Sequence, residues 1–205
     1  MAVIIFDFDG TVADSLPVVL DIYKELLPGK KEITHEEIHR LRRMPLQKIT
    51  AELGVPMWKL PFLLRKGRRL MRVRIHTVEI FPGIAEAVQQ LHASGNTLYM
   101  ISSNSTENVQ MFLREKQLLQ YFMEARGYPG IHKKAKALKK LSKRHNFNLS
   151  ETYYVGDEVR DMTAAKQAGM RTVAVTWGFN DRQLLQGTEP DILVEKPKDL
   201  IKKLA

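Results

Sequence analysis

The sequence contains no cysteine. Disulfides, thiolate metal sites and a cysteine nucleophile are therefore excluded together. Also missing is any uncharged apolar run of about 18 residues, the length that a helix needs to span a bilayer. The apolar run near the N-terminus is short and follows no basic stretch, which is unlike a secretory signal peptide. We therefore expect a cytoplasmic protein that does not associate with membranes.

Acidic residues are nearly absent from residues 40–74, which we call the basic segment. It holds eleven arginines and lysines against the single acid Glu52, while the whole chain of 205 residues has a net charge of +9. A charge run is most often the solvated face of a helix. Two alternatives stay open: the segment steers an anionic substrate, or it binds nucleic acid. Nucleic acid is the least favoured partner, because Trp58 and Phe62 are the only aromatic residues nearby and no nucleic-acid-binding signature is present.

Apolar runs alternate with helical patterns along most of the chain. The runs at 3–8, 97–102, 152–156, 171–176 and 191–194 predict buried strands. Stretches with apolar residues at helical spacing lie between these runs, as in 82–95, which opens with Pro82 and ends at Gly95. This alternation predicts an α/β fold with a doubly wound, Rossmann-like parallel sheet.

Residues 14–80 interrupt the alternation. They contain helix-like runs separated by prolines and no convincing strand. We therefore expect a small α-helical cap at 14–80, inserted into an α/β core made of residues 1–13 and 81–205. A chain of this length can bury one full core and a small subdomain beside it.

Two carboxylates stand at the end of the first apolar run. Asp7 and Asp9 flank Phe8, so alternation along a strand points both carboxylates to one side and Phe8 to the other. Ligands bind at the carboxyl ends of strands in such sheets, and two neighbouring carboxylates repel unless a cation or a proton lies between them. A turn cap is the alternative that this pair alone leaves open.

A second acidic cluster follows the strand at 152–156. That strand ends in Gly156 and continues into Asp157 and Glu158, with Asp161 one helical turn further on. Carboxylates from two strand ends form an oxygen-only site, which suits Mg²⁺ better than zinc.

Two further stretches supply polar donors. Ser102, Ser103 and Asn104 stand at the end of the strand at 97–102, where hydroxyl, amide and backbone donors bind an oxyanion. Lys133 and Lys134 precede the strand that leads to the second acidic cluster. A lysine there neutralises a phosphate or keeps a carboxylate ionised.

The four stretches together resemble the haloacid dehalogenase-like (HAD) hydrolase superfamily. The sequences DFDGT, SSN, a lysine and GDEVRD occur in the order of that family's motifs. The helical insertion after the first motif resembles the phosphoglycolate-phosphatase-like branch. The resemblance implies a Mg²⁺-dependent phosphatase that acts on a small phosphorylated metabolite.

The resemblance also implies a role for each residue. Asp7 is the nucleophile that forms an aspartyl-phosphate, and Asp9 is the general acid and base. Mg²⁺ is held by Asp7, Asp157 and the backbone carbonyl of Asp9. The phosphate is bound by Gly10, Thr11, Ser103, Asn104 and Lys134, and the supporting residues are Gly156, Glu158 and Asp161.

Some alternatives remain at this stage. Ser103 is favoured over Ser102 because an asparagine follows it, and Lys134 over Lys133 because its spacing to Leu138 fits the next helix. A phosphosugar mutase of the same superfamily is the alternative enzyme, and a phosphate-binding or nucleic-acid-binding module is the alternative outside enzymes. The oligomeric state is left as monomer or homodimer.

One motif is expected to mislead. Residues 35–39 match the zinc pattern H-E-x-x-H through His35 and His39. Thr34 and Glu37 also form a capping box, which predicts that a short helix starts at His35. We favour the helix start, because no third zinc ligand is evident.

Overall fold

The computed structural model describes residues 1–29, 33–128 and 134–204. Six strands form one parallel sheet in the order β5-β4-β1-β6-β7-β8. Their bounds are β1 (Val3–Phe6), β4 (Thr97–Ser102), β5 (Phe122–Gly127), β6 (Thr152–Gly156), β7 (Arg171–Val175) and β8 (Ile192–Val194). The predicted α/β class with a parallel sheet is therefore confirmed.

Helices cover both faces of this sheet. The helices are α5 (Ile84–Ala93), α6 (Thr106–Glu115) and α10 (Pro197–Leu204) on one face, and α7 (Lys134–His145) and α8 (Val159–Ala168) on the other. Ile4 and Phe6 of β1 belong to the first buried cluster, whereas Ile5 between them belongs to the second. A strand buried on both faces reads as a continuous apolar run, which explains the start of the sequence. A short helix α9 (Arg182–Gln186) follows β7.

The strand predictions fail at one edge of the sheet. Residues 122–127, FMEARG, form the edge strand β5, although no strand was predicted there. Only Phe122 and Ala125 are buried, and Glu124 and Arg126 are at least partly exposed. An edge strand lacks the continuous apolar run that reveals a central one.

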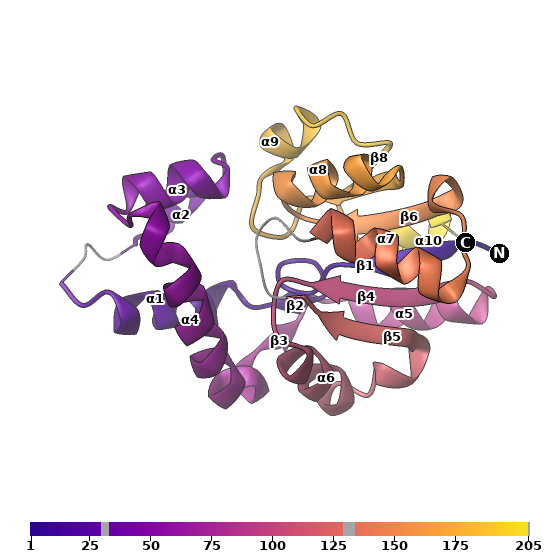
Figure 1. The fold of residues 1–205 in the computed structure, drawn as a ribbon, viewed down its shortest axis with the longest axis horizontal. Helices are drawn as coiled ribbons and strands as arrows, with labels where there is room; N and C mark the ends of the chain where they lie inside the picture. The colour runs from indigo at the N-terminus through magenta and orange to yellow at the C-terminus, as the bar shows by residue number, and fades with distance from the viewer. Residues whose placement is uncertain (30–32, 129–133, 205) are drawn as a thin grey trace.

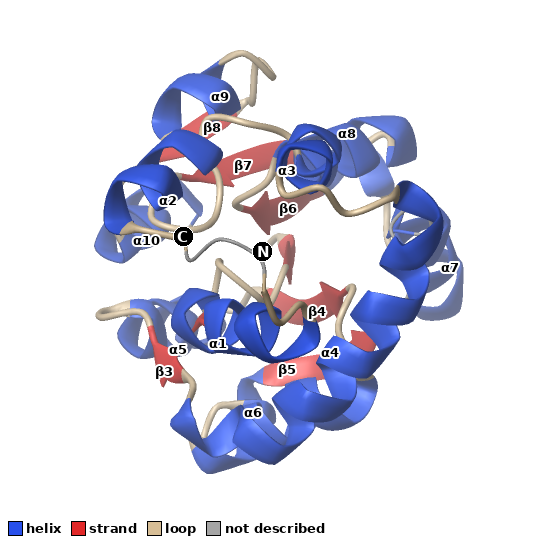
Figure 2. Ribbon diagram, turned by 90° about the vertical axis from the view of Figure 1, so that its left-hand side faces the viewer, coloured by secondary structure: helices blue, strands red, loops and turns tan. Residues whose placement is uncertain are grey.

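Four helices lie beyond the carboxyl ends of the strands (Figure 1). They are α1 (Leu16–Leu26), α2 (His35–Leu41), α3 (Leu46–Glu52) and α4 (Leu60–Arg74). Viewed from that side, they stand in front of the sheet (Figure 2). Val18 and Ile22 of α1 and Met71 of α4 join the same buried cluster as β1. Helices α1 and α4 of this helical group therefore pack on the core.

A two-stranded ribbon connects the helical group to the sheet. Its strands are β2 (Ala13–Asp14) and β3 (Glu79–Ile80), which pair antiparallel through Ala13 with Ile80 and Asp14 with Glu79. The expectation that residues 14–80 contain no strand is wrong at both ends, because strands of two residues carry too short a pattern to detect. Among the described residues, no helix combines the length and the apolar character that a membrane crossing requires.

Candidate active site

Three neighbouring strands deliver the predicted residues to one edge of the sheet. Asp7 follows β1 in the centre, Asn104 follows β4 on one side, and Asp157 follows β6 on the other. The helical group lies over this edge (Figure 1). Residues about 50 or more positions apart in the sequence therefore meet because the strands are parallel.

A tight turn after β1 sets the geometry of the first motif. The backbone N–H groups of Thr11, Val12 and Ala13 all donate to the carbonyl oxygen of Phe8. Gly10 adopts a φ of +79°, and a Cβ on it would lie 2.1 Å from Oδ2 of Asp157. Only glycine allows this turn to pass so close to the second acidic cluster.

Three buried carboxylates converge between the strands. Asp7, Asp157 and Asp161 each place one oxygen within 4.8 Å of the others. Burial, together with the charge of Asp161, raises the pKa of Asp7 to about 7. Burial and then the negative charges of Glu158, Asp161 and Asp7 raise the pKa of Asp157 well above its usual range. Such a cluster is costly for the folded state without a cation.

The oxygen Oδ1 of Asp7 is an acceptor with an unmet requirement. It is buried and accepts no hydrogen bond from the described residues. A buried anionic oxygen without a donor calls for a ligand. The all-oxygen donor set around it fits Mg²⁺. The residues present therefore fit the metal that the sequence predicts.

Lys134, the first residue of α7, closes the cluster from the other side. Its Nζ lies 3.0 Å from Oδ2 of Asp7 and also pairs with Oδ1 of Asp161. The side chain is only 5% exposed. Burial alone would lower the pKa of Lys134, but the charges of Asp161 and Asp7 outweigh it and hold that pKa well above its usual value. Lys134 is thus a fixed cation.

Asp157 is held in place by two donors. The hydroxyl of Thr11 donates to its Oδ1 at 2.7 Å, and the N–H of Phe179 donates to its Oδ2 at 2.7 Å. The indole Nε1 of Trp177 donates to the carbonyl of Thr11 at 3.1 Å. The loop after β7 therefore fixes both the first motif and the second acidic cluster.

A chain of amides orients Asp9. Nδ2 of Asn104 donates to Oδ2 of Asp9 at 3.0 Å, and Nδ2 of Asn108 donates to Oδ1 of Asn104 at 2.8 Å. The same Asn108 amide donates to the carbonyl of Arg68 in α4 at 3.0 Å. Burial raises the pKa of Asp9 above its usual value. The chain thus links α4 of the helical group to the carboxyl of Asp9.

The two serines after β4 lie in different environments. Ser102 is buried, and its Oγ accepts a hydrogen bond from the N–H of Asn104 at 2.9 Å. Ser103 is half-buried. The geometry therefore leaves Ser103 as the more accessible hydroxyl, and its choice over Ser102 as the phosphate ligand stays a prediction.

A family model decides the identity. The model described as haloacid dehalogenase-like hydrolase matches residues 4–175, which is most of the chain. The chain belongs to this family. Within the HAD-like family it is 38% identical to a phosphoglycolate phosphatase from Synechococcus elongatus, over 98% of this chain and 96% of the relative. A phosphoglycolate phosphatase from Salmonella typhimurium is 27% identical over 97% and 90%, respectively.

Solved structures agree on the HAD-like fold. A HAD-like hydrolase from Streptococcus pneumoniae superposes with a TM-score of 0.81 at 23% identity, covering 100% of this chain and 99% of that one. The predictions of the family, of the fold class and of a phosphatase enzyme are confirmed by these findings.

The remaining predicted residues belong to the carboxylate cluster or lie around it. Asp161 lies in the carboxylate cluster, whereas the side chain of Asp9 does not. A Cβ on Gly156 would lie 2.7 Å from the Cβ of Asp161, so the close approach of strand and helix requires glycine there. The N–H of Gly10 donates to the carbonyl of Ala13 at 2.9 Å. Lys133 lies outside the described residues.

Sequence reasoning missed three contributors. Asn108 and Arg160 are absent from the predicted site residues; residues 177–179 were considered as a possible border of the active site, but no donor role was predicted for the N–H of Phe179. A backbone donor leaves no trace in a sequence. Asn108 does leave one: it occupies a buried position of α6 beside Val109 and Phe112, where a polar residue needs a partner. Arg160 stands inside the GDEVRD stretch and pairs with Glu158.

The zinc pattern is a helix start. Thr34 accepts from the N–H of Glu37, and the Glu37 side chain accepts from the N–H of Thr34, so the predicted capping box is confirmed. Among the residues that the structure describes, the three-carboxylate cluster is the one group of side chains that could hold a metal ion. Neither His35 nor His39 belongs to it.

Part of the basic segment is paired. Arg40 forms an ion pair with Glu52, Arg43 with Asp181 and Arg74 with Glu25. The pair of Arg43 and Asp181 joins the helical group to the loop after β7. Three arginines of the basic segment are therefore engaged in ion pairs within the protein. Substrate steering and nucleic-acid binding by this segment stay predictions.

Proposed function

We propose that this HAD-like protein is a Mg²⁺-dependent phosphatase that hydrolyses a small phosphomonoester, with 2-phosphoglycolate as the first candidate. The observation that carries the proposal is the state of Asp7. One oxygen is held by Lys134 and the other is buried without a donor from the described residues. The substrate candidate rests on the relative that is 38% identical over nearly the whole chain.

The reaction uses Asp7 and Asp9 in two steps. An oxygen of Asp7 bonds to phosphorus as the bond between phosphorus and the alcohol oxygen breaks. Asp9 donates a proton to the departing alcohol oxygen. Water then attacks phosphorus while Asp9 takes a proton, and the bond between Asp7 and phosphorus breaks to release phosphate. Asn104 keeps Asp9 oriented through both steps. Ser103 and Lys134 bind the phosphoryl oxygens.

Asp7, Asp157 and the backbone carbonyl of Asp9 would hold the metal, with Asp161 beside it. Bound Mg²⁺ would neutralise charge and so allow an anionic nucleophile and an anionic substrate to approach. Residues 14–80 would act as the cap, with α1 to α4 covering the edge of the sheet where the chemistry takes place.

The test is release of inorganic phosphate from 2-phosphoglycolate and from an aryl phosphate, with Mg²⁺ or with EDTA. We expect release with Mg²⁺ only, and loss of at least about 1,000-fold in Asp7→Asn, because the nucleophile is removed. The matched control is Asp21→Asn, at an exposed position of α1, which should retain activity.

Three outcomes would contradict the proposal. Asp7→Asn as active as the wild type would remove Asp7 as nucleophile. Full activity in EDTA after exhaustive metal removal would remove the Mg²⁺ requirement. Transfer of the phosphoryl group between sugar positions without release of phosphate would establish the mutase instead.

A further inference from the structure

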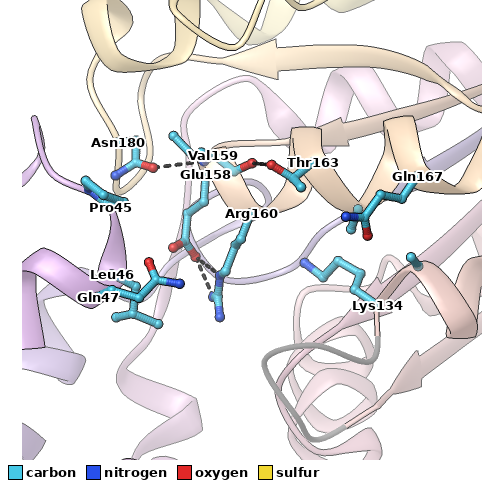
Figure 3. A pocket seen from close by; sticks show the side chains of 12 residues that line it. Pro45, Leu46, Gln47, Lys134, Glu158, Val159, Arg160, Thr163, Gln167 and Asn180 are labelled. Atoms are coloured by element: carbon cyan, nitrogen blue, oxygen red, sulfur yellow. Dashed lines mark hydrogen bonds and ion pairs between the residues drawn. The ribbon is translucent and has the colours of Figure 1, made fainter. Parts of the chain in front are cut away.

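A cavity of about 420 Å³ lies beside the carboxylate cluster, between the helical group and α8 (Figure 3). Pocket volumes for small ligands range from roughly 300 to 1,000 Å³, so a small metabolite fits. Pro45, Leu46 and Gln47, at and just before the start of α3, form one wall, and Glu158 and Arg160 form part of the other. Lys134 also lines the cavity, which connects it to the proposed site of phosphoryl transfer.

Arg160 is the cation of this cavity that the proposed mechanism does not use. Its Nε donates to Oε1 of Glu158 at 2.9 Å, and its Nη2 donates to the same oxygen. The Glu158 side chain is 9% exposed and that of Arg160 is 26% exposed. The guanidinium is therefore anchored on one side and accessible on the other.

The anchor leaves donors free for a ligand. A guanidinium carries five N–H donors in a planar fork, and Glu158 uses two of them, which leaves three. Arg160 and Lys134 point into the cavity from different sides, and the side chain of Gln47 lines the same cavity (Figure 3). A planar guanidinium fork suits a carboxylate, which accepts two parallel hydrogen bonds, and an amide in the same cavity adds a further donor.

The placement separates two anion sites. Lys134 contacts Asp7 directly, at 3.0 Å, and so serves the phosphoryl group. Arg160 contacts Glu158 instead, and it lines the same cavity as Lys134. A ligand with a phosphate at one end and a second anion at the other would use both.

We propose that Arg160, anchored by Glu158 and assisted by Gln47, binds the carboxylate of a short phosphorylated carboxylic acid and so selects this substrate class. The inference rests on the proposed phosphatase function and assigns a specificity-determining residue within it. Selection arises because a substrate without the carboxylate leaves the cavity-facing donors of Arg160 unmatched.

The test compares two substrates of equal chain length, 2-phosphoglycolate and ethyl phosphate, which differ by the carboxylate. We expect the wild type to prefer 2-phosphoglycolate in kcat/KM, and Arg160→Gln to reduce that preference by about 100-fold. Arg160→Lys keeps the charge but loses the fork, so it should recover only part of the preference. Arg182→Gln, at an exposed arginine of α9 that pairs with Glu195, is the matched control and should keep the full preference.

The outcomes separate the two proposals. If the wild type releases no phosphate from any ester, the proposed function fails. If it hydrolyses both esters but Arg160→Gln lowers both rates by one common factor, only the role of Arg160 is overturned. Should Arg160→Gln fail to fold, Arg160→Lys decides: a preference equal to that of the wild type overturns the inference.

Discussion

Lys134 concentrates several roles in one side chain. It is 5% exposed, contacts Asp7 and Asp161, and its pKa is held high by those two charges. Removing one member of a buried charge cluster leaves the others uncompensated, which costs more than the cluster contributes when intact. Lys134 is thus a stability residue as well as a candidate phosphate ligand.

We expect Lys134→Gln to lower the free energy of unfolding by about 3 kcal/mol, because Asp7 and Asp161 then repel each other without a cation between them. Urea unfolding in EDTA at neutral pH measures this. The matched control is Lys143→Gln, at an exposed position of the same helix, with a change within about 0.5 kcal/mol. Adding Asp161→Asn to Lys134→Gln should recover part of the loss; a double variant as unstable as the sum of both changes would contradict the repulsion.

At this scale the sequence predicted the charged residues better than their partners. Asp7, Asp157 and Lys134 meet as expected, because parallel strands end at one edge. The preference for Lys134 over Lys133 came from helical spacing, and α7 does begin at Lys134. The hydrogen bond from Phe179 to Asp157 uses a backbone N–H, which every residue except proline supplies, so no side-chain pattern could predict it.

The loop after β7 is the element that joins the helical group to the core. Oδ1 of Asn180 accepts from the N–H of Val159 at 3.0 Å, while its Nδ2 donates to the carbonyls of Arg42 and Met44 at 3.4 and 3.3 Å. The N–H of Asp181 also donates to the carbonyl of Arg42, at 2.9 Å. Asn180 thus bridges the start of α8 and the segment before α3.

We expect Asn180→Asp to loosen this bridge selectively. Aspartate keeps the acceptor for Val159 but replaces the donor to Arg42 and Met44 with a negative oxygen. KM for 2-phosphoglycolate should rise by about 5-fold, which is the equivalent of one ordinary hydrogen bond. Amide exchange in residues 42–47 should speed up as well.

The matched control for the bridge is Asn148→Asp, at an asparagine whose side chain accepts from the N–H of Ser150, far from the cavity. Its exchange pattern in 42–47 should equal that of the wild type. Unchanged exchange in Asn180→Asp would show that the bridge contributes nothing to holding the helical group.

Elements differed in how well their patterns predicted them. The central strands were predicted to within two residues, because burial on both faces demands apolar runs. The edge strand β5 was missed, since Glu124 and Arg126 tolerate exposure there. The ribbon of β2 and β3 was missed because two residues per strand show no periodicity.

For the whole molecule, the acidic cluster sets how stability depends on pH. Burial raises the pKa of Asp7 to about 7 from 3.8 and also raises the pKa of Asp157 and Glu158. Between about pH 4 and about pH 7 these carboxyls bind more protons in the folded state than in the unfolded state, so their contribution to the stability of the metal-free protein falls as pH rises. Above that range the loss from Asp7 is complete.

Thermal unfolding at about pH 5.5 and about pH 8 checks this expectation. In EDTA the Tm should be lower at the higher pH, and Mg²⁺ should raise it more at the higher pH, because the cation binds the ionised carboxylates of the folded state. Asp157→Asn should weaken both effects; Asn keeps an acceptor for Phe179 and a donor towards the Thr11 hydroxyl. A Tm that rises with pH in EDTA would contradict the expected balance.

The ribbon of β2 and β3 also bears on how the sequence can change during evolution. Ala13 and Ile80 are paired neighbours, so the residues that leave the first motif and those that return to the sheet stand side by side. An inserted segment that begins and ends at two neighbouring residues can vary in length without shifting the strands of the sheet. The edge that carries the carboxylate cluster and the helical group that lies over it are therefore free to change at different rates.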